Sequence, residues 1–288
     1  MIAISVIVPW YGERALEGCL QALGRQTLAR ELFEVIVVNN RADEKPACDG
    51  AAYGNVTVVE ERRPGSYAAR NRGVQLARGR WLAFTDADCV PDERWLEAGL
   101  QHAAVQDPLG GHIRLVARDP PSLAERYDVV FGLDQKGYVE NSGFAATANL
   151  IVSRAVFDTV GPFDARLRSA GDWEWCLRAA RCGHPVAYCA EAVVAHPTRT
   201  RWWQIVRKAL RVQGGMRALR SQLHLELAPG ALRSWVDAFY PRRYVARLFA
   251  LRSAGDRAWW RLYLAACLIN GLAVLESLRL RLGGTPLR

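Results

Sequence analysis

Two carboxylates, Asp86 and Asp88, follow the apolar run Trp81–Thr85 with one residue between them. The run is short and apolar, which predicts a buried strand, so both acids would stand at the carboxyl end of that strand. Carboxylate oxygens are preferred ligands of Mg²⁺ and Mn²⁺, and a cation held there can bridge phosphate oxygens. An Asp-x-Asp sequence by itself is equally compatible with an ordinary solvated loop.

A second polar segment, Pro9–Glu13, follows the apolar run Ile2–Val8, which predicts the first strand. The segment can present the Tyr11 ring and the Glu13 carboxylate to a base or a ribose. The simpler interpretation is a strand-to-helix turn in which Glu13 lies near the start of the next helix, where the helix dipole favours an acid.

A third candidate is Arg70, within Ala69–Gly73 of the predicted helix Tyr67–Arg78. Its planar guanidinium suits a nucleobase carbonyl or a phosphate group. Because Arg78 and Arg80 follow closely, a solvated basic face is the alternative.

Alternating apolar runs and helical spacing predict the elements that would position these residues. The predicted strands begin with Ile2–Val8, Phe33–Val38, Val56–Val59 and Trp81–Thr85, with helices at Glu13–Gln26 and Tyr67–Arg78. This order predicts an α/β fold with a mostly parallel sheet flanked by helices. Ligands of such sheets bind beyond the carboxyl ends of the strands. Further along we expect helices at Asp92–Ala103 and Asp172–Cys182, strands at Gly110–Val116 and Ala145–Val152, and two short strands within Pro185–Ala195.

These blocks together resemble the family 2 glycosyltransferases with the GT-A fold. The resemblance covers about Ile4 to Pro197. The matching blocks of the first half are Pro9-x-Tyr11-x-Glu13, Asn39-Asn40, Ala69-Arg70-Asn71-x-Gly73 and Thr85-Asp86-Ala87-Asp88. Those of the second half are Thr147–Asn149, Val160–Asp164, Gly171–Glu174 and Arg178.

The resemblance implies an inverting transfer of a sugar from a nucleotide-diphosphate sugar to an acceptor hydroxyl, with Mg²⁺ or Mn²⁺ as cofactor. A UDP-sugar donor and a carbohydrate or lipid-linked acceptor are favoured, in cell-surface polysaccharide or glycolipid synthesis. Carried over residue by residue, it implies a nucleotide pocket lined by Pro9, Tyr11, Glu13, Asn39, Arg70 and Asp86, with Asp88 on the metal.

The sequence departs from the family pattern at three positions. Asn39 stands where the family usually has an Asp that reads the uracil edge, and an amide can both donate and accept a hydrogen bond. Uracil specificity is therefore not implied. Gly12 replaces a common Asn, and Gly171 occupies the first position of a Glu-Asp pair.

Asp172 matches the second position of that pair, which implies the catalytic base. The acceptor hydroxyl must lose its proton during attack, and a positioned carboxylate contributes on the order of 10²–10⁴-fold to such a step. Asp172 also suits a cap of the following helix. Beside it, Trp173 would suit stacking on an acceptor sugar, although one of Trp173 and Trp175 must point into the core.

His196, at a predicted strand end, is the remaining candidate. We expect it to be a third metal ligand or to touch the diphosphate. A histidine that is merely hydrogen-bonded is the alternative.

Two other functional classes fit the sequence less well. A sugar nucleotidyltransferase would carry a Gly-rich basic loop after the first strand, whereas this turn has only Gly12 and no Lys. A non-catalytic nucleotide-binding or scaffold protein would give no reason for the three acids at 86, 88 and 172. No spacing of a nucleic-acid recognition motif is present, so no nucleic-acid partner is expected.

The basic charge of the chain is concentrated in its last part. Residues 199–288 contain 17 of the 38 Lys and Arg residues and four of the 29 Asp and Glu residues, a net charge of +13 against −4 for the first 198. We therefore predict a GT-A domain over residues 1–198 and a basic, Trp- and Arg-rich helical region over residues 199–288. The basic region should meet an anionic partner.

A membrane surface is the partner that this region suits best. Arg201–Arg220 predicts an amphipathic helix, and aromatic and basic residues bracket the apolar run Leu262–Leu275. We expect that run to be too short to cross a bilayer, and no secretory signal is visible. Seven cysteines without a CxxC pair indicate a reducing compartment. We expect a cytoplasmic enzyme, peripheral on the inner face of the cytoplasmic membrane, unless these helices pack on the protein.

Overall fold

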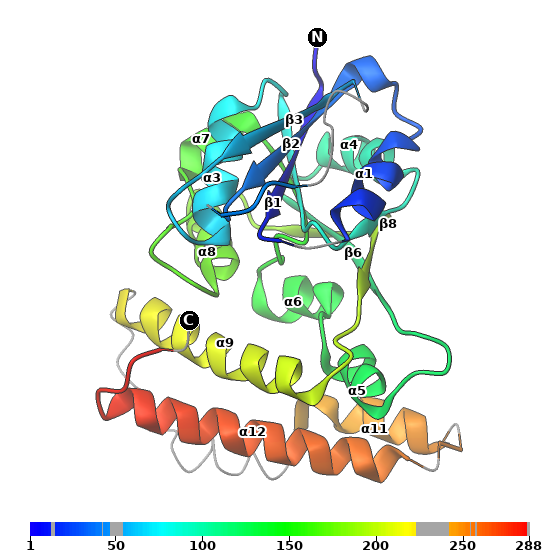
Figure 1. Cartoon of the computed structure of the whole chain (residues 1–288), viewed down its shortest axis with the longest axis vertical. Coiled ribbons are helices and arrows are strands. Elements are labelled where there is room, and N and C mark those ends of the chain that lie inside the picture. Colours follow the sequence, from blue (N-terminus) through cyan, green and yellow to red (C-terminus); the bar gives the residue numbers. More distant parts are fainter. Residues whose placement is uncertain are drawn as a thin grey trace. The chain divides into compact units, whose positions relative to one another are not determined.

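The computed structural model describes residues 1–12, 15–41, 43–46, 54–222, 242–253, 255–256 and 258–286. The chain divides into two compact units, each described here by itself (Figure 1). The α/β unit consists of Met1–Arg114, Asp134–Leu167 and Gly171–Pro197. The helical unit consists of Leu115–Leu133, Arg168–Ala170 and Thr198–Arg288, so it draws on three segments of the chain.

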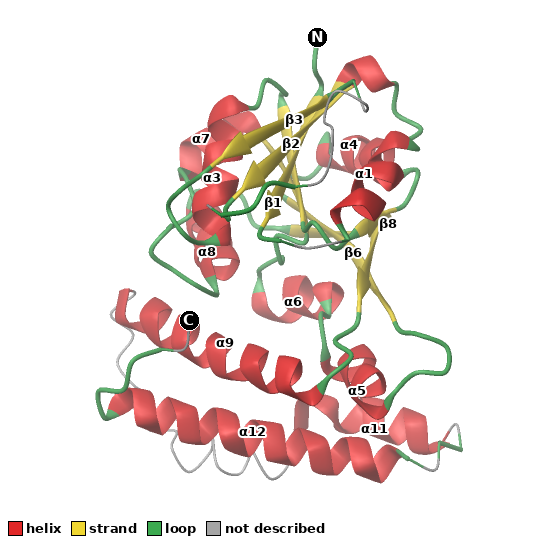
Figure 2. Ribbon diagram, viewed as in Figure 1, coloured by secondary structure: helices red, strands yellow, loops and turns green. Residues whose placement is uncertain are grey.

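One mixed sheet organises the α/β unit (Figure 2). Its strands are β1 (Ile4–Trp10), β2 (Phe33–Asn39), β3 (Val56–Glu60), β4 (Trp81–Thr85), β5 (Val90–Pro91), β6 (Leu109–Val116), β7 (Asn149–Ser153) and β8 (Ala187–Pro197). They follow the order β3-β2-β1-β4-β7-β6-β8-β5. The first four of this order pair in parallel, whereas β7 is antiparallel to both β4 and β6. The predicted α/β class is confirmed, but the sheet is mixed rather than mostly parallel, because β7 and β5 pair antiparallel with their neighbours.

Helices cover both faces of this sheet. They are α1 (Leu16–Gly24), α3 (Ser66–Leu76), α4 (Trp95–Ala103), α6 (Gln135–Ser142), α7 (Arg154–Val160) and α8 (Gly171–Arg181), with the 3₁₀ turn η1 (Arg30–Leu32). Figure 2 shows α3, α7 and α8 on one side of the strands and α1 and α4 on the other. β1 and β2 are therefore buried from both faces, which explains why they read as nearly continuous apolar runs.

The pairing of the strands collects the candidate residues. In the parallel register Trp10 lies opposite Asn39, and Ile7 lies opposite Phe84. The segments that follow β1, β2 and β4 therefore leave the sheet at one edge. β5 pairs antiparallel with β8, which sets Val90 opposite Ala195. This pairing brings the end of β8 beside the acids that precede β5.

Three predicted elements differ from the structure. Helix α4 begins at Trp95 rather than at Asp92, because the backbone N–H of Trp95 closes a turn on the Asp92 carbonyl. The two short strands predicted within Pro185–Ala195 are the single strand β8. β7 begins at Asn149, because Gln135 binds the backbone of Ala146 and holds the preceding residues in a turn.

The helical unit is held by a small apolar core. Its helices are α5 (Leu123–Phe131), α9 (Trp202–Gln222), α11 (Arg242–Ser253) and α12 (Trp259–Arg281). Leu262, Ala266 and Ile269 of α12 pack in one cluster with Ile205 of α9, against which Val206 and Ala209 also pack. The apolar stripe predicted on Arg201–Arg220 is thus largely covered within this unit.

Helix α12 corrects one expectation from the sequence. It has 23 residues, and an 18-residue window of mean hydropathy 1.4 makes it long and apolar enough to cross a membrane by length and composition. The charge-free run Leu262–Leu275 alone predicts a segment that is too short to cross a membrane, whereas the helix extends beyond that run at both ends. Only 28% of that window is buried within the structure, so much of the helix surface is not packed on the described protein.

Candidate active site

Asp86, Asp88 and His196 form one cluster in the α/β unit, as the sequence suggested. Their ligand atoms, with the Cys89 sulfur, lie within 4.8 Å of one another. Asp86 and Asp88 follow β4, and His196 is brought to them by the pairing of β8 with β5. His196 Nε2 lies 3.9 Å from Asp88 Oδ1.

The tautomer of His196 suits a metal ligand. Its Nδ1 lies 2.7 Å from the Pro197 carbonyl oxygen, which can only accept a hydrogen bond, so Nδ1 carries a proton. In the neutral ring Nε2 then presents its lone pair toward Asp88. Metal-binding histidines are commonly oriented in this way by a backbone carbonyl. Two carboxylates and one imidazole nitrogen form a donor set that fits Mg²⁺ or Mn²⁺.

Cys89 is a different kind of neighbour. It is fully buried, and burial, reinforced by the charges of Asp86 and Asp88, raises the pKa of its thiol well above the ordinary value. Burial likewise raises the pKa of Cys19 to about 12, with the same two acids adding to the effect. Both thiols stay protonated, and a protonated thiol does not compete with carboxylates for a hard cation.

Arg70 is held against this cluster from α3. Its side chain is almost fully buried, and its Nη2 donates a hydrogen bond of 2.5 Å to Asp86 Oδ1. Among the residues that the structure describes, the buried Nε of Arg70 has no hydrogen-bond partner. A buried N–H group without a partner costs free energy.

The turn after β1 exposes one aromatic ring at the same edge. The Tyr11 side chain is 63% exposed, whereas Trp10 is buried and Pro9 is half-buried. Gly12, in place of the family's common Asn, has φ +93°, a backbone conformation that favours glycine. Glu13 lies outside the described residues.

Asn39, at the end of β2, is held by its own loop. Its Nδ2 donates to the Glu44 carbonyl oxygen over 2.8 Å, and its Oδ1 accepts from the Arg41 backbone N–H over 2.8 Å. One donor position and one acceptor lone pair are therefore used locally. Counting partners among the described residues, the amide retains one of each, which is the minimum for reading a base edge.

Asp172 stands in the first turn of α8. Its Oδ1 accepts the Trp173 backbone N–H over 3.0 Å and lies 3.3 Å from the Tyr67 hydroxyl. Burial raises the pKa of Asp172 above its ordinary value, although the Trp173 N–H, Arg70 and Tyr67 act in the opposite direction. A carboxylate with a raised pKa is a better proton acceptor than an exposed one.

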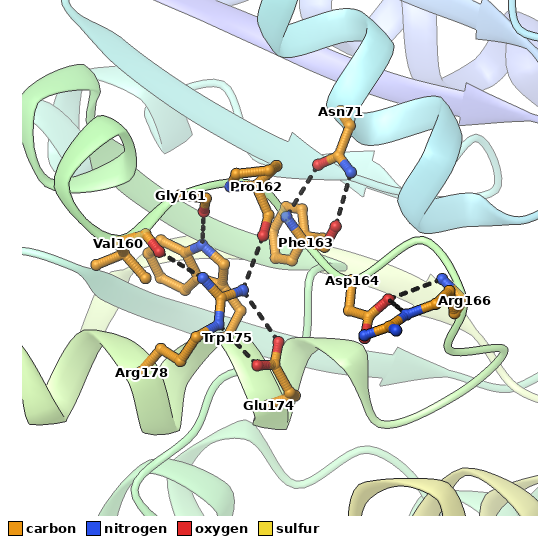
Figure 3. A network of polar contacts seen from close by, with 10 residues as sticks. All are labelled: Asn71, Val160, Gly161, Pro162, Phe163, Asp164, Arg166, Glu174, Trp175 and Arg178. Atoms are coloured by element: carbon orange, nitrogen blue, oxygen red, sulfur yellow. Dashed lines mark hydrogen bonds and ion pairs between the residues drawn. The ribbon is translucent and has the colours of Figure 1, made fainter. Parts of the chain in front are cut away.

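A network around α8 explains several other residues of the matching blocks (Figure 3). Arg178 donates to the Val160 and Pro162 carbonyl oxygens and pairs with Glu174. Trp175, fully buried, donates its indole N–H to the Gly161 carbonyl oxygen over 2.8 Å. These residues hold the 160–166 loop against α8, so their roles are structural.

The two tryptophans beside Asp172 differ as helix spacing requires. Trp175 lies in the core, while Trp173 is half-buried and stacks on Phe144 with ring centroids 5.1 Å apart. Phe144 in turn stacks on Tyr138 at 4.8 Å. The platform at Trp173 is therefore part of a three-ring stack, which the sequence did not indicate.

Tyr67 is the site residue that sequence reasoning missed. It lies one helical turn before Arg70 on the buried face of α3, and the Arg70 guanidinium lies 5.8 Å from its ring centroid. Through Arg70 and Tyr67, one helix contacts both Asp86 and Asp172. The spacing of three residues within Ser66–Leu76 was the only sequence signal of this arrangement.

Comparison with known proteins identifies relatives of this chain. The profile of the family described as Glycosyl transferase family 2 matches residues 5–161. Among curated proteins, the glycosyltransferase AglE of Haloferax volcanii is 34% identical over 220 residues, which are 74% of this chain and 72% of that protein.

Two solved structures that share the fold illustrate the likeness. The mannosyltransferase PcManGT from Pyrobaculum calidifontis, in complex with GDP-Man and Mn²⁺, superposes with a TM-score of 0.63 at 18% identity, over 96% of this chain and 86% of that one. The structure of TarS 1–349 from S. aureus in complex with UDP gives a TM-score of 0.55 at 18% identity, over 98% and 92%. At this identity the likeness concerns the fold.

Proposed function

The chain belongs to glycosyl transferase family 2, and on that premise we propose that it is an inverting, metal-dependent enzyme that uses a nucleotide-diphosphate sugar. The observation that carries the proposal is the cluster of Asp86, Asp88 and His196 at the carboxyl edge of the sheet, linked through α3 to Asp172. A nucleotidyltransferase or a scaffold would have no use for a carboxylate such as Asp172 in this place.

Asp88 and His196 would hold a divalent cation, with Asp86 on the nucleotide side. When bound, such a cation neutralises charge that develops on the leaving nucleoside diphosphate. PcManGT was solved with Mn²⁺, which supports the same choice here. Arg70 would orient Asp86 through their hydrogen bond.

The donor nucleotide would lie over the edge formed by Pro9, Tyr11 and Asn39, with Glu13 contributing as the sequence predicted. The relatives were solved with GDP-Man and with UDP, so both nucleotides are compatible with the fold. We favour a uridine donor, and the Asn39 amide is the residue that would tune that preference.

Asp172 would act as the base in a single displacement. The acceptor oxygen forms a bond to the anomeric carbon, the bond from that carbon to the phosphate oxygen breaks, and the acceptor proton passes to Asp172. One displacement inverts the configuration at the anomeric carbon. The ring of Trp173 would support the acceptor sugar by stacking.

The acceptor would be a carbohydrate or a lipid-linked sugar of a cell-surface polysaccharide or glycolipid. The name of AglE describes a glycosyltransferase, and the helical unit offers a surface suited to lipids. On α12, five apolar side chains recur along one exposed stripe: Trp260, Leu264, Leu268, Leu272 and Leu275. Exposed Arg261, Arg279 and Arg281 on the same helix would meet anionic headgroups. We propose a cytoplasmic, peripheral position at that surface.

A donor screen tests the proposed reaction. Nucleoside diphosphate released from a panel of UDP- and GDP-sugars is measured with Mn²⁺ or Mg²⁺ and with a chelator. We expect release from one nucleotide class, loss on chelation, and loss in Asp88→Ala but not in Asp158→Asn, an exposed acid of α7. Release that persists unchanged with the chelator would contradict the metal, and release from no donor would contradict the proposed reaction.

A further inference from the structure

The Tyr67 hydroxyl lies at the start of α8 with every hydrogen-bonding position in use. It accepts the backbone N–H groups of Gly171 at 2.9 Å and of Asp172 at 3.2 Å. Both groups can only donate, so the hydroxyl proton is left to donate to Asp172 Oδ1, which lies 3.3 Å away. Burial, together with the charge of Asp172, raises the pKa of Tyr67 far above its ordinary value. Tyr67 is therefore a donor at any working pH.

The Tyr67 ring occupies the space that a side chain at residue 171 would need. A Cβ at Gly171 would lie 2.6 Å from Cε2 and 2.8 Å from both Cδ2 and Cζ of that ring. Position 171 therefore accommodates only glycine while the Tyr67 ring occupies this space. Two residues 104 positions apart in sequence thus meet in one close contact.

The ring has little room to shift away. It packs on Phe163 with centroids 5.8 Å apart, and Phe163 is fixed by paired hydrogen bonds with the Asn71 side chain, one of 2.8 Å from Nδ2 and one of 3.0 Å to Oδ1 (Figure 3). The Arg70 guanidinium also lies over the Tyr67 ring, 5.8 Å from its centroid. The hydroxyl is consequently held in place by α3, by the 160–166 loop and by α8.

We propose that Tyr67 is the positioning residue of Asp172. It holds the carboxylate with Oδ1 occupied by two hydrogen bonds, so that among the described residues Oδ2 is the oxygen left to take the acceptor proton. The inference rests on the proposed role of Asp172 as base. The proton of Tyr67 is not itself transferred.

The central test compares Tyr67→Phe with the wild-type enzyme. The variant keeps the ring and removes only the hydroxyl. We expect unchanged Mn²⁺-dependent affinity for the nucleoside diphosphate and a kcat lower by about tenfold. Because the hydroxyl stabilises the ionised carboxylate, its loss should move the acidic limb of the kcat–pH profile up by about one pH unit.

A matched control is Tyr188→Phe on β8 of the same unit. It removes a hydroxyl that lies 2.9 Å from Nδ1 of His112 on β6. It should change neither kcat nor the acidic limb. The double variant Tyr67→Phe/Asp172→Asn should retain the same residual rate as Asp172→Asn, because Tyr67 acts only through the carboxylate.

Two outcomes separate this inference from the proposed function. If Asp172→Asn loses activity while Tyr67→Phe lowers only the melting temperature, with kcat and the acidic limb unchanged, Tyr67 merely caps α8 and the inference is overturned. If Asp172→Asn retains wild-type turnover, the assignment of the base fails instead. A tenfold loss in Tyr67→Phe with a displaced acidic limb, absent from Tyr188→Phe, would support the positioning role.

Discussion

Asp88 and Asp172 serve different steps of the proposed reaction, so their removal should give different defects. Asp88→Ala should abolish metal-dependent nucleotide binding together with transfer. Asp172→Asn keeps the size of the side chain but cannot accept a proton, so it should bind the donor normally and lose about 10²–10⁴-fold in kcat. Calorimetry of nucleotide binding and turnover assays separate the two. Near wild-type turnover in Asp172→Asn would show that another group is the base.

The pH profile of turnover follows from the environment of Asp172. Burial raises the pKa of this carboxyl above its ordinary value, which is about 3.9. The base works only when ionised, so activity is present above that raised pKa and is lost as the pH falls through it. The acidic limb of kcat should therefore lie above the ordinary range of Asp. A limb at or below about 4 would contradict this.

Asn39 should influence the choice of nucleotide. Asn39→Asp keeps the acceptor for the Arg41 N–H, loses the donor to the Glu44 carbonyl, and presents a carboxylate that can accept the uracil N–H. Nucleoside diphosphate affinities should shift toward uridine. Asn55→Asp, which loses a comparable bond to the Phe33 carbonyl oxygen, is the control. The same order of affinities in wild type and Asn39→Asp would remove Asn39 from the base pocket.

At the scale of elements, the contact between α3 and α8 is tested at Gly171. Gly171→Ala would force its Cβ into the Tyr67 ring, and overpacking of this kind costs about 1–3 kcal/mol of stability. Gly18→Ala in α1, where nothing lies within 4 Å of the added Cβ, should instead be neutral or stabilise by about 0.5 kcal/mol. Denaturant unfolding measures both. Equal stability of the two variants would argue against a tight contact.

The hydrogen-bond network of Figure 3 predicts a loss of stability when Arg178 is replaced. Arg178→Leu leaves the Val160 and Pro162 carbonyl oxygens without their donor and Glu174 without its partner. We expect a loss of about 2 kcal/mol in the free energy of unfolding. Arg181→Leu, an exposed position of the same helix, should change it by less than about 0.5 kcal/mol.

The elements that the sequence predicted well are those with a strong local pattern. β1, β2 and β4 are short apolar runs, and their ends located Asn39, Asp86 and Asp88. Helices α5, α6 and α7 were missed. The capping box of Ser122 and Glu125 could have located α5, whereas α6 and α7 are only eight and seven residues long. Tyr67 was missed for another reason: its partners lie more than 100 residues away, and no local pattern reports such a contact.

At the scale of the whole molecule, the exposed apolar stripe of α12 should determine how much of the protein sediments with liposomes. Wild type should sediment with anionic liposomes more than with neutral ones, and high salt should weaken this binding. Leu264→Ser/Leu268→Ser removes two exposed leucines and should weaken binding at least tenfold. Val129→Ser, an exposed apolar residue of α5, is the control. No sedimentation with either lipid, together with a tight dimer, would favour packing between copies.

The placement of Tyr67 and Arg70 one turn apart on α3 has a consequence for engineering of this enzyme. A helical turn is stiff, so Asp86 and the proposed base Asp172 are kept at a set separation by one rigid helix. We expect that loops such as the one after β2 can be exchanged between relatives to alter donor choice without moving the proposed base. A graft of Ser66–Leu76 into a relative should succeed only when residues 171 and 172 are transferred with it, because the Tyr67 ring leaves no space for a side chain at position 171.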